Sequence, residues 1–140
     1  MLIENPLNES SIAFPILDSI HIFGIVCGVG TAAVMNLRLL GVGMSRSGPA
    51  RLWNETMLLT LGGLVLAVSS GLLLFSIDPE MYYANHAFRF KMASLLIALG
   101  FYYTMVRRAA LRDRRASIVA VISLGLYAFV PLGGILIGYE

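Results

Sequence analysis

Two histidines, His21 and His86, lie within strongly apolar stretches of the 140-residue chain. Ionisable side chains are rare in stretches that span a membrane, and they usually have a function there. The ring nitrogens of histidine can ligate haem iron, copper or zinc. A histidine can also simply hydrogen-bond to a neighbouring helix. We therefore take both residues as candidate metal ligands, with a purely structural pair as the alternative interpretation.

The residues around the two histidines match the needs of a b-type haem site. Gly24 and Gly28 follow the first histidine on the same helical face and would leave room for a flat porphyrin. Arg89 follows the second histidine by three positions and is the candidate partner of a haem propionate. Asp18, one turn before the first histidine, could bond to water or to a ring N–H. The predicted cofactor site consists of His21, His86, Gly24, Gly28, Arg89 and Asp18.

The composition indicates which environment must hold these residues. Hydrophobic residues make up 58% of the chain, charged residues only 13%, and the mean hydropathy is +0.81. A soluble domain of this size cannot bury so much apolar surface, so the surplus must face lipid. The net charge of +2 is too small to indicate a nucleic-acid surface, and the single cysteine excludes CxxC metal motifs.

Four apolar stretches are long enough to cross a bilayer, which takes about 20 residues per helix. They are expected at about 11–40, 53–77, 79–107 and 116–139. The connections between them are short, so consecutive helices should run antiparallel. The sequence thus predicts an all-α integral membrane protein, a single domain over residues 1–140 that folds as an up-down-up-down four-helix bundle.

The basic residues indicate how such a bundle is oriented. Arginines gather at the first and third connections, namely Arg38, Arg46, Arg51, Arg107, Arg108, Arg112, Arg114 and Arg115. The other ends carry acidic residues instead, namely Glu4, Glu9, Asp78, Glu80 and Glu140. Because basic loops stay on the cytoplasmic side, both termini should face outward across a bacterial inner membrane. Binding of a partner or of anionic lipid is the alternative use of these arginines.

In this arrangement the two histidines are expected at one depth. His86 lies seven residues beyond Pro79, about 10 Å along a helix, and His21 lies ten residues beyond Ser11, about 15 Å. The first and third helices run in the same direction and are diagonal neighbours in a square bundle. Their separation of about 14 Å suits two histidines that reach inward to one iron. Small residues of the second and fourth helices, "SSG" (69–71) and "PLGG" (131–134), fall in the same layer.

The runs "HIFGIVCGVGTAAVMNLRLLG" and "NHAFRFKMASLLIALG" resemble a family of small bacterial four-helix membrane proteins. That family is similar to CopD-type copper-resistance membrane domains and, more distantly, to small b-type cytochromes. The cytochrome-like relatives imply a histidine-ligated haem, carried here by His21 and His86. The copper-resistance relatives imply a copper role, although this chain lacks a Met- or His-rich tract.

These observations predict a membrane electron-transfer protein with one bis-histidine haem b in the outer leaflet. A single haem there cannot carry electrons across the membrane alone, so a quinone or a redox partner protein is expected, or a homo-oligomer. The first alternative is a cofactor-free structural or assembly subunit of a membrane complex. The second is a copper-binding membrane protein.

Overall fold

The computed structural model describes residues 6–43, 46–113, 116–137 and 139, and in these ranges every regular element is a helix. The predicted all-α class is therefore confirmed. Glu4, Arg114, Arg115 and Glu140 of the predicted charge asymmetry lie outside the described residues. In chain order the elements are η1 (Pro6–Glu9), α1 (Ala13–Leu40), α2 (Pro49–Ile77), α3 (Pro79–Ala84), α4 (His86–Phe101), η2 (Tyr102–Val106), α5 (Arg107–Leu111) and α6 (Ser117–Ile137).

Three of these helices, α1, α2 and α6, are long and apolar enough to cross a membrane. Their lengths are 28, 29 and 21 residues, against the roughly 20 that a bilayer core requires. Most of their large apolar side chains are exposed, for example Leu58 at 75% and Ile118 at 77%. Such surfaces are stable facing lipid, so the fold supports a membrane-embedded protein.

The third predicted helix, expected at 79–107, is divided in the structure. Asp78 caps α3 through a bond from the Met81 amide to its carboxylate (3.1 Å). Asn85 then adopts an extended conformation and caps α4, accepting a bond from the Phe88 amide (2.9 Å). From there α4, η2 and α5 follow one another without a break to Leu111, and η2 is one π-helical segment in this run.

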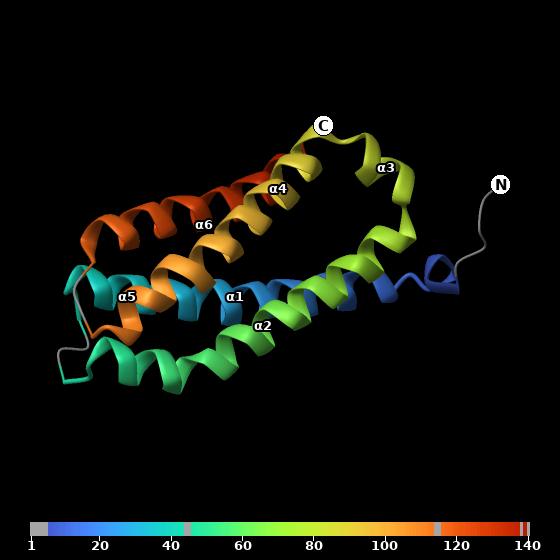
Figure 1. Ribbon diagram of the computed structural model, residues 1–140. Coiled ribbons are helices and arrows are strands. Elements are labelled where there is room, and N and C mark those ends of the chain that lie inside the picture. Colours follow the sequence, from blue (N-terminus) through green and yellow to red (C-terminus); the bar gives the residue numbers. More distant parts are fainter. Residues whose placement is uncertain (1–5, 44–45, 114–115, 138, 140) are drawn as a thin grey trace.

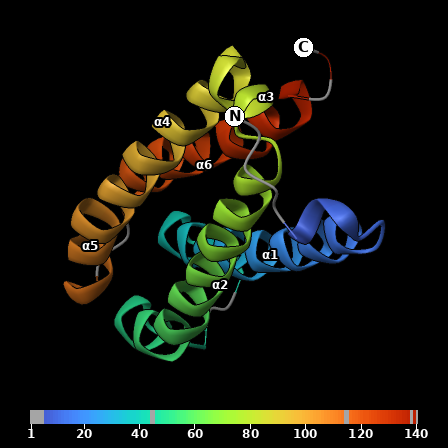
Figure 2. The same ribbon diagram turned by 90° about the vertical axis from the view of Figure 1, so that its right-hand side faces the viewer.

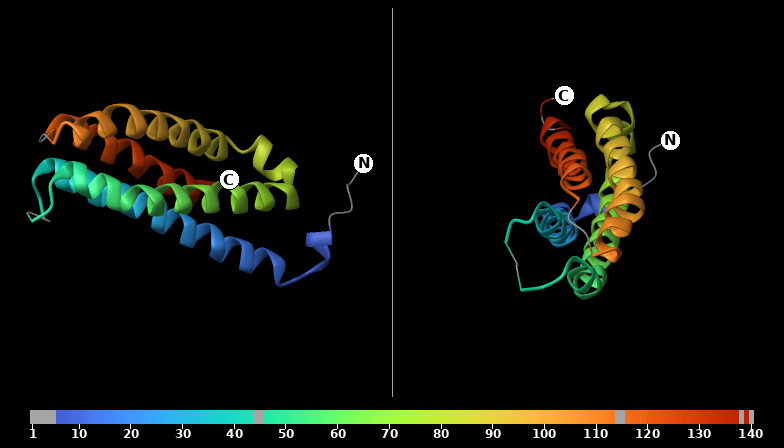
Figure 3. Two further views of the ribbon diagram at one scale, coloured as in Figure 1. Left: turned by 60° about the horizontal axis from the view of Figure 1, so that its bottom comes forward. Right: turned by 60° about the vertical axis from the view of Figure 1, so that its left-hand side comes forward.

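The long helices associate as two pairs, α1 with α2 and α4 with α6 (Figure 1). At one end of the molecule, which we call the arginine-rich end, the last turn of α1, the start of α2, α5 and the start of α6 come together. Arg38, Arg51 and Arg107 lie in the helices there. At the opposite end, the acidic end, the first turns of α1 diverge from α4 and α6 (Figures 1 and 3). Figure 2 shows α1 and the α4–α6 pair extending in different directions from α2.

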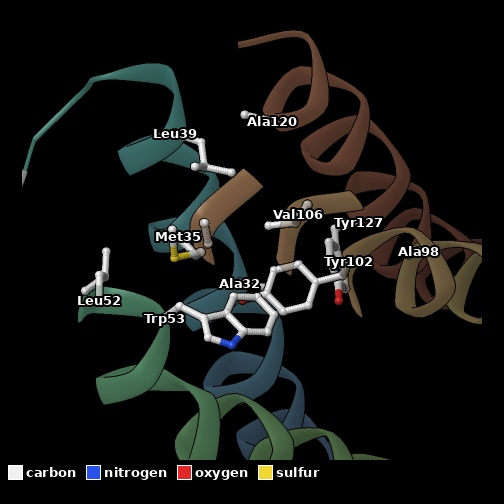
Figure 4. Close-up of a cluster of buried hydrophobic side chains, with 11 residues drawn as sticks. Ala32, Met35, Leu39, Leu52, Trp53, Ala98, Tyr102, Val106, Ala120 and Tyr127 are labelled. Carbon is white, nitrogen blue, oxygen red and sulfur yellow. The ribbon is translucent and has the colours of Figure 1, made fainter. Parts of the chain in front are cut away.

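The packed core lies near the arginine-rich end. Figure 4 shows Trp53 of α2 against the Tyr102 ring, with centroids 5.1 Å apart, and Met35 and Leu39 of α1 beside them. The cluster of buried side chains comprises Ala32, Met35, Leu39, Leu52, Trp53, Ala98, Tyr102, Val106, Ala110, Ala120 and Tyr127. The core thus holds the two helix pairs together at one end, and the other half of the molecule is left less tightly filled.

Candidate functional site

A cavity of about 330 Å³ lies in that less tightly filled half. Its walls come from α1, α2, α3, α4 and α6 and are almost wholly apolar, and the ionisable residues of its lining are His21, Tyr82 and Lys91. We call it the His21 cavity. It is lined by His21, Ile25, Val29, Leu64, Ala67, Val68, Gly71, Leu72, Leu74, Phe75, Tyr82, Phe88, Lys91, Met92, Leu95 and Val130.

The His21 ring is fixed against α2 by its Nδ1 atom. Nδ1 lies 2.7 Å from the carbonyl oxygen of Ala67 and 3.2 Å from the Ser70 hydroxyl. A carbonyl oxygen can only accept, so Nδ1 must carry a proton and donate it. Within the described part of the chain both ring bonds use Nδ1. In the neutral imidazole, Nε2 therefore keeps its lone pair for a ligand or a hydroxyl donor.

The sequence "SSG" on α2 makes room for this ring. A Cβ atom at Gly71 would lie only 3.0 Å from Cε1 of His21, so the missing side chain lets the imidazole rest on α2. Ser70 donates its own proton to the Leu66 carbonyl (2.6 Å), which leaves its oxygen available to Nδ1. Gly71, one of the small residues predicted at this level, thus makes room for the histidine itself.

The "PLGG" sequence on α6 does the same for Lys91 of α4. A Cβ atom at Gly133 would lie 2.9 Å from the Cβ atom of Lys91, and one at Gly134 would lie 3.4 Å from Nζ. The lysine stem therefore lies along the two glycines, half-buried, with its amine near Gly134. The two small-residue motifs thus each accommodate one ionisable side chain at the same end of the cavity.

Asp18 supplies a negative charge near these groups. Its carboxylate acts electrostatically on His21, Lys91 and Tyr82. Burial, together with the charges of Asp18 and Asp78, raises the pKa of Tyr82, so this phenol is protonated at neutral pH. The predicted bond between Asp18 and the ring N–H of His21 is not formed. The Ala67 carbonyl takes that place.

Gly24 and Gly28 serve helix packing, which corrects their predicted role beside a porphyrin. A Cβ atom at Gly24 would lie 2.6 Å from the Ala67 amide nitrogen, and one at Gly28 would lie 2.9 Å from that of Leu64. Both positions therefore face the backbone of α2 and let the two helices approach closely. Neither glycine lines the His21 cavity.

His86 and Arg89 lie elsewhere than predicted. Because Asn85 restarts the helix, His86 is the first residue of α4 and not an interior one. Its side chain is exposed, and its Nδ1 atom accepts a bond from the guanidinium of Arg89, which is also exposed (3.0 Å). His86 does not line the cavity that His21 lines, so the structure does not bring the two predicted ligands together.

Of the cavity residues, the predicted site included His21 alone, and the polar or sulfur-bearing residues that it missed are Tyr82, Lys91 and Met92. For the two on α4, the signal is the spacing of Phe88, Lys91, Met92 and Leu95, which places them on one helical face. The apolar residues Phe88, Met92 and Leu95 identify this face of α4, whereas the predicted site was placed on the face of His86 and Arg89.

Among the described residues no group of three or more histidine, cysteine or acidic side chains is placed to hold a metal ion. Comparison of the chain with protein-family models, with curated proteins and with solved structures finds no match.

Proposed function

We propose that this protein is a membrane protein that binds a lipid-soluble molecule with a polar ring head, of the quinone and quinol class, in the His21 cavity. The observation that carries the proposal is a chamber with apolar walls whose lining includes two ionisable side chains, His21 and Lys91, close enough to interact electrostatically. Ligand sites in proteins typically combine mostly apolar walls with a few convergent polar groups.

The hydrogen-bonding capacity of these groups suits both redox forms of such a head. Neutral His21 offers Nε2 as an acceptor for a quinol hydroxyl, because Nδ1 already donates to Ala67. The Lys91 ammonium donates, and so suits a quinone carbonyl. Tyr82 carries a hydroxyl on the same cavity wall that can do either. The walls around these groups have the apolar character that a ring and its substituents need.

The four-span arrangement is part of the proposal. After Asn85, the 16 residues of α4 continue through the 5 of η2 and the 5 of α5, which exceeds the roughly 20 residues that a span requires. With α1, α2 and α6 this gives an up-down-up-down topology in a bacterial inner membrane. The arginine-rich end is then cytoplasmic, and both termini and the His21 cavity belong to the outer half.

A haem b ligated by His21 is the second candidate. It is favoured by the Nδ1–H bond to the Ala67 carbonyl, since metal-bound histidines usually donate their other N–H to such an acceptor. A bound haem would supply one-electron exchange with a quinone or a partner protein. His86 does not fit as the opposite ligand, and Met92 is the other soft donor on the cavity wall. At about 330 Å³ the cavity is near the small end of ligand sites, which favours a single ring over a porphyrin.

The two histidines provide a matched test. Purified protein in lipid nanodiscs is titrated with a short-chain ubiquinol analogue, and bound ligand is measured after separation from free ligand. We expect His21→Ala to weaken binding about tenfold or more, because the variant loses the hydrogen bond between Nε2 and the quinol hydroxyl. We expect His86→Ala to leave binding unchanged. Equal loss in both variants, or no saturable binding to the wild type, would overturn the proposal.

The same preparations decide the second candidate. A reduced-minus-oxidised visible spectrum with a low-spin haem signal that disappears in His21→Ala and persists in His86→Ala supports haem ligated by His21. Loss of the signal in both variants restores the bis-histidine prediction. A colourless wild type from haem-replete cells excludes haem.

A further inference from the structure

A second apolar depression runs beside the His21 cavity, between α2 and the α4–η2 run. Its volume is about 400 Å³, and it is more open to the surface than the cavity. We call it the α2–α4 groove. It is lined by Leu61, Leu64, Val65, Val68, Ser69, Leu72, Leu99 and Tyr103.

The groove and the cavity share one wall. Leu64, Val68 and Leu72 of α2 line both. These residues follow one another at four-residue spacing, so they form a continuous ridge along one helical face. A molecule seated in the cavity is therefore separated from the groove only by three aliphatic side chains.

The groove extends from that ridge toward the arginine-rich end. Leu61 on α2 and Tyr103 on η2 lie closer to that end than any cavity residue of the same two helical runs. From Leu72 to Leu61 the distance along α2 is about 16 Å at 1.5 Å per residue. The groove thus extends along α2 over a length that a single hydrocarbon chain can occupy.

The part of the lining that α2 provides is aliphatic except for Ser69, which donates to the carbonyls of Val65 (2.7 Å) and Leu66 (3.2 Å) on its own helix. Tyr103 of η2 adds a second hydroxyl, which is buried and has no hydrogen-bond partner among the described residues. The α2 side of the groove therefore suits aliphatic carbon.

We propose that the α2–α4 groove holds the hydrocarbon tail of the ligand whose ring head occupies the His21 cavity. This inference rests on the proposed function. It specifies the ligand class further, as a ring carrying one long aliphatic or isoprenoid chain. The head then lies at His21 and Lys91, toward the acidic end, and the tail runs along α2 toward the arginine-rich end.

A photoreactive quinone tests this placement. The probe carries a ubiquinone-type ring and a decyl tail with a diazirine at its far end, and it is irradiated with the wild-type protein in nanodiscs. We expect mass spectrometry to find the label on the segments that contain Leu61 and Val65 and that contain Leu99 and Tyr103. An excess of the tailless ring compound should remove this labelling, because both molecules compete for the cavity.

Two leucines of the same helix give matched variants. Leu61→Trp fills the groove, whereas Leu58→Trp adds the same bulk at a position 75% exposed and outside it. Labelling should fall several-fold in Leu61→Trp and stay constant in Leu58→Trp, with binding of the tailless ring unchanged in both.

The outcomes separate the two proposals. If the tailless ring binds saturably but the diazirine labels other lipid-facing surfaces such as α6, the tail inference is wrong and the proposed function stands. If competition never reduces labelling and the ring shows no saturable binding, the cavity holds no such head and both proposals fail.

Discussion

At the scale of single residues, consecutive glycines of α2 have opposite surroundings. A Cβ atom at Gly63 would overlap the backbone amide nitrogen of Gly28 and lie 2.8 Å from the Cβ atom of Cys27. A Cβ atom at Gly62 would meet nothing within 4 Å. The close approach of α1 and α2 therefore depends on the absence of a side chain at Gly63 and not at Gly62.

This contrast gives a prediction for stability. Gly63→Ala should lower the free energy of unfolding by about 1–3 kcal/mol, because two helix backbones must move apart. Gly62→Ala should leave it unchanged or raise it by about 0.5–1 kcal/mol, as alanine favours helix over glycine. Thermal denaturation in one detergent, followed by circular dichroism, measures both variants. Equal destabilisation would show that helix flexibility and not packing governs this region.

The ionisable residues show how far the sequence alone leads. Of the small residues predicted at the level of the histidines, Gly71 and Gly133 make room for His21 and Lys91, whereas Gly24 and Gly28 face the backbone of α2. The sequence alone does not show whether a glycine makes room for a histidine ring or for a flat cofactor. Only the orientation of each helix distinguishes them, and the apolar sequences of α1 and α2 encode that orientation weakly because most of their faces are apolar.

At the scale of elements, each of the four predicted apolar stretches is helical, and the error lies inside the third. The helix predicted at 79–107 includes Asn85, whereas in the structure the Asn85 side chain caps a new helix. An asparagine followed by apolar residues is compatible with both. Its side chain makes a second bond, from Nδ2 of Asn85 to the Ile137 carbonyl of α6 (3.5 Å), a long-range contact that no local pattern reveals. Because Asn85 caps α4, His86 is the first residue of that helix and does not lie inside a longer one.

The cap can be tested by two substitutions at one site. Asn85→Ala removes the acceptor of the Phe88 amide and should lower the free energy of unfolding by about 1 kcal/mol. Asn85→Asp keeps an acceptor at the same position, so it should retain most of the cap while losing the bond to Ile137. Chemical denaturation in mixed micelles compares them. If both variants match the wild type, the cap does not determine where α4 begins.

At the scale of the whole molecule, the packing is uneven along the length of the helices. Trp53, Tyr102 and Tyr127 fill the space between the helix pairs near the arginine-rich end. Toward the acidic end the pairs diverge, and the His21 cavity occupies the gap. The sequence predicts open space at the level of His21, but as the centre of a square bundle with a second histidine opposite. Composition and spacing do not predict that the large side chains gather at one end or that the helix pairs diverge at the other.

The arrangement of the spans gives the last prediction. Ser11, Ser76 and Ser117 are exposed residues at three helix ends. In a Cys27→Ser background each is changed to cysteine, and intact cells are treated with a membrane-impermeant maleimide. If α4, η2 and α5 cross the membrane together, Ser11→Cys and Ser76→Cys react, while Ser117→Cys reacts only after permeabilisation.

Ser117 is the decisive position, because among the helices of the described residues α1, α2 and α6 alone meet the length and hydropathy expected of a span. If the α4–α5 run lay along the outer surface, Ser76→Cys and Ser117→Cys would react together in intact cells. Such a result would place the arginine-rich end of α5 outside, against the charge rule. It would also be inconsistent with the packing of Lys91 against Gly133 and Gly134 of a spanning α6. Labelling only after permeabilisation instead fixes the His21 cavity in the outer half, where a lipid-soluble ligand reaches it from the bilayer.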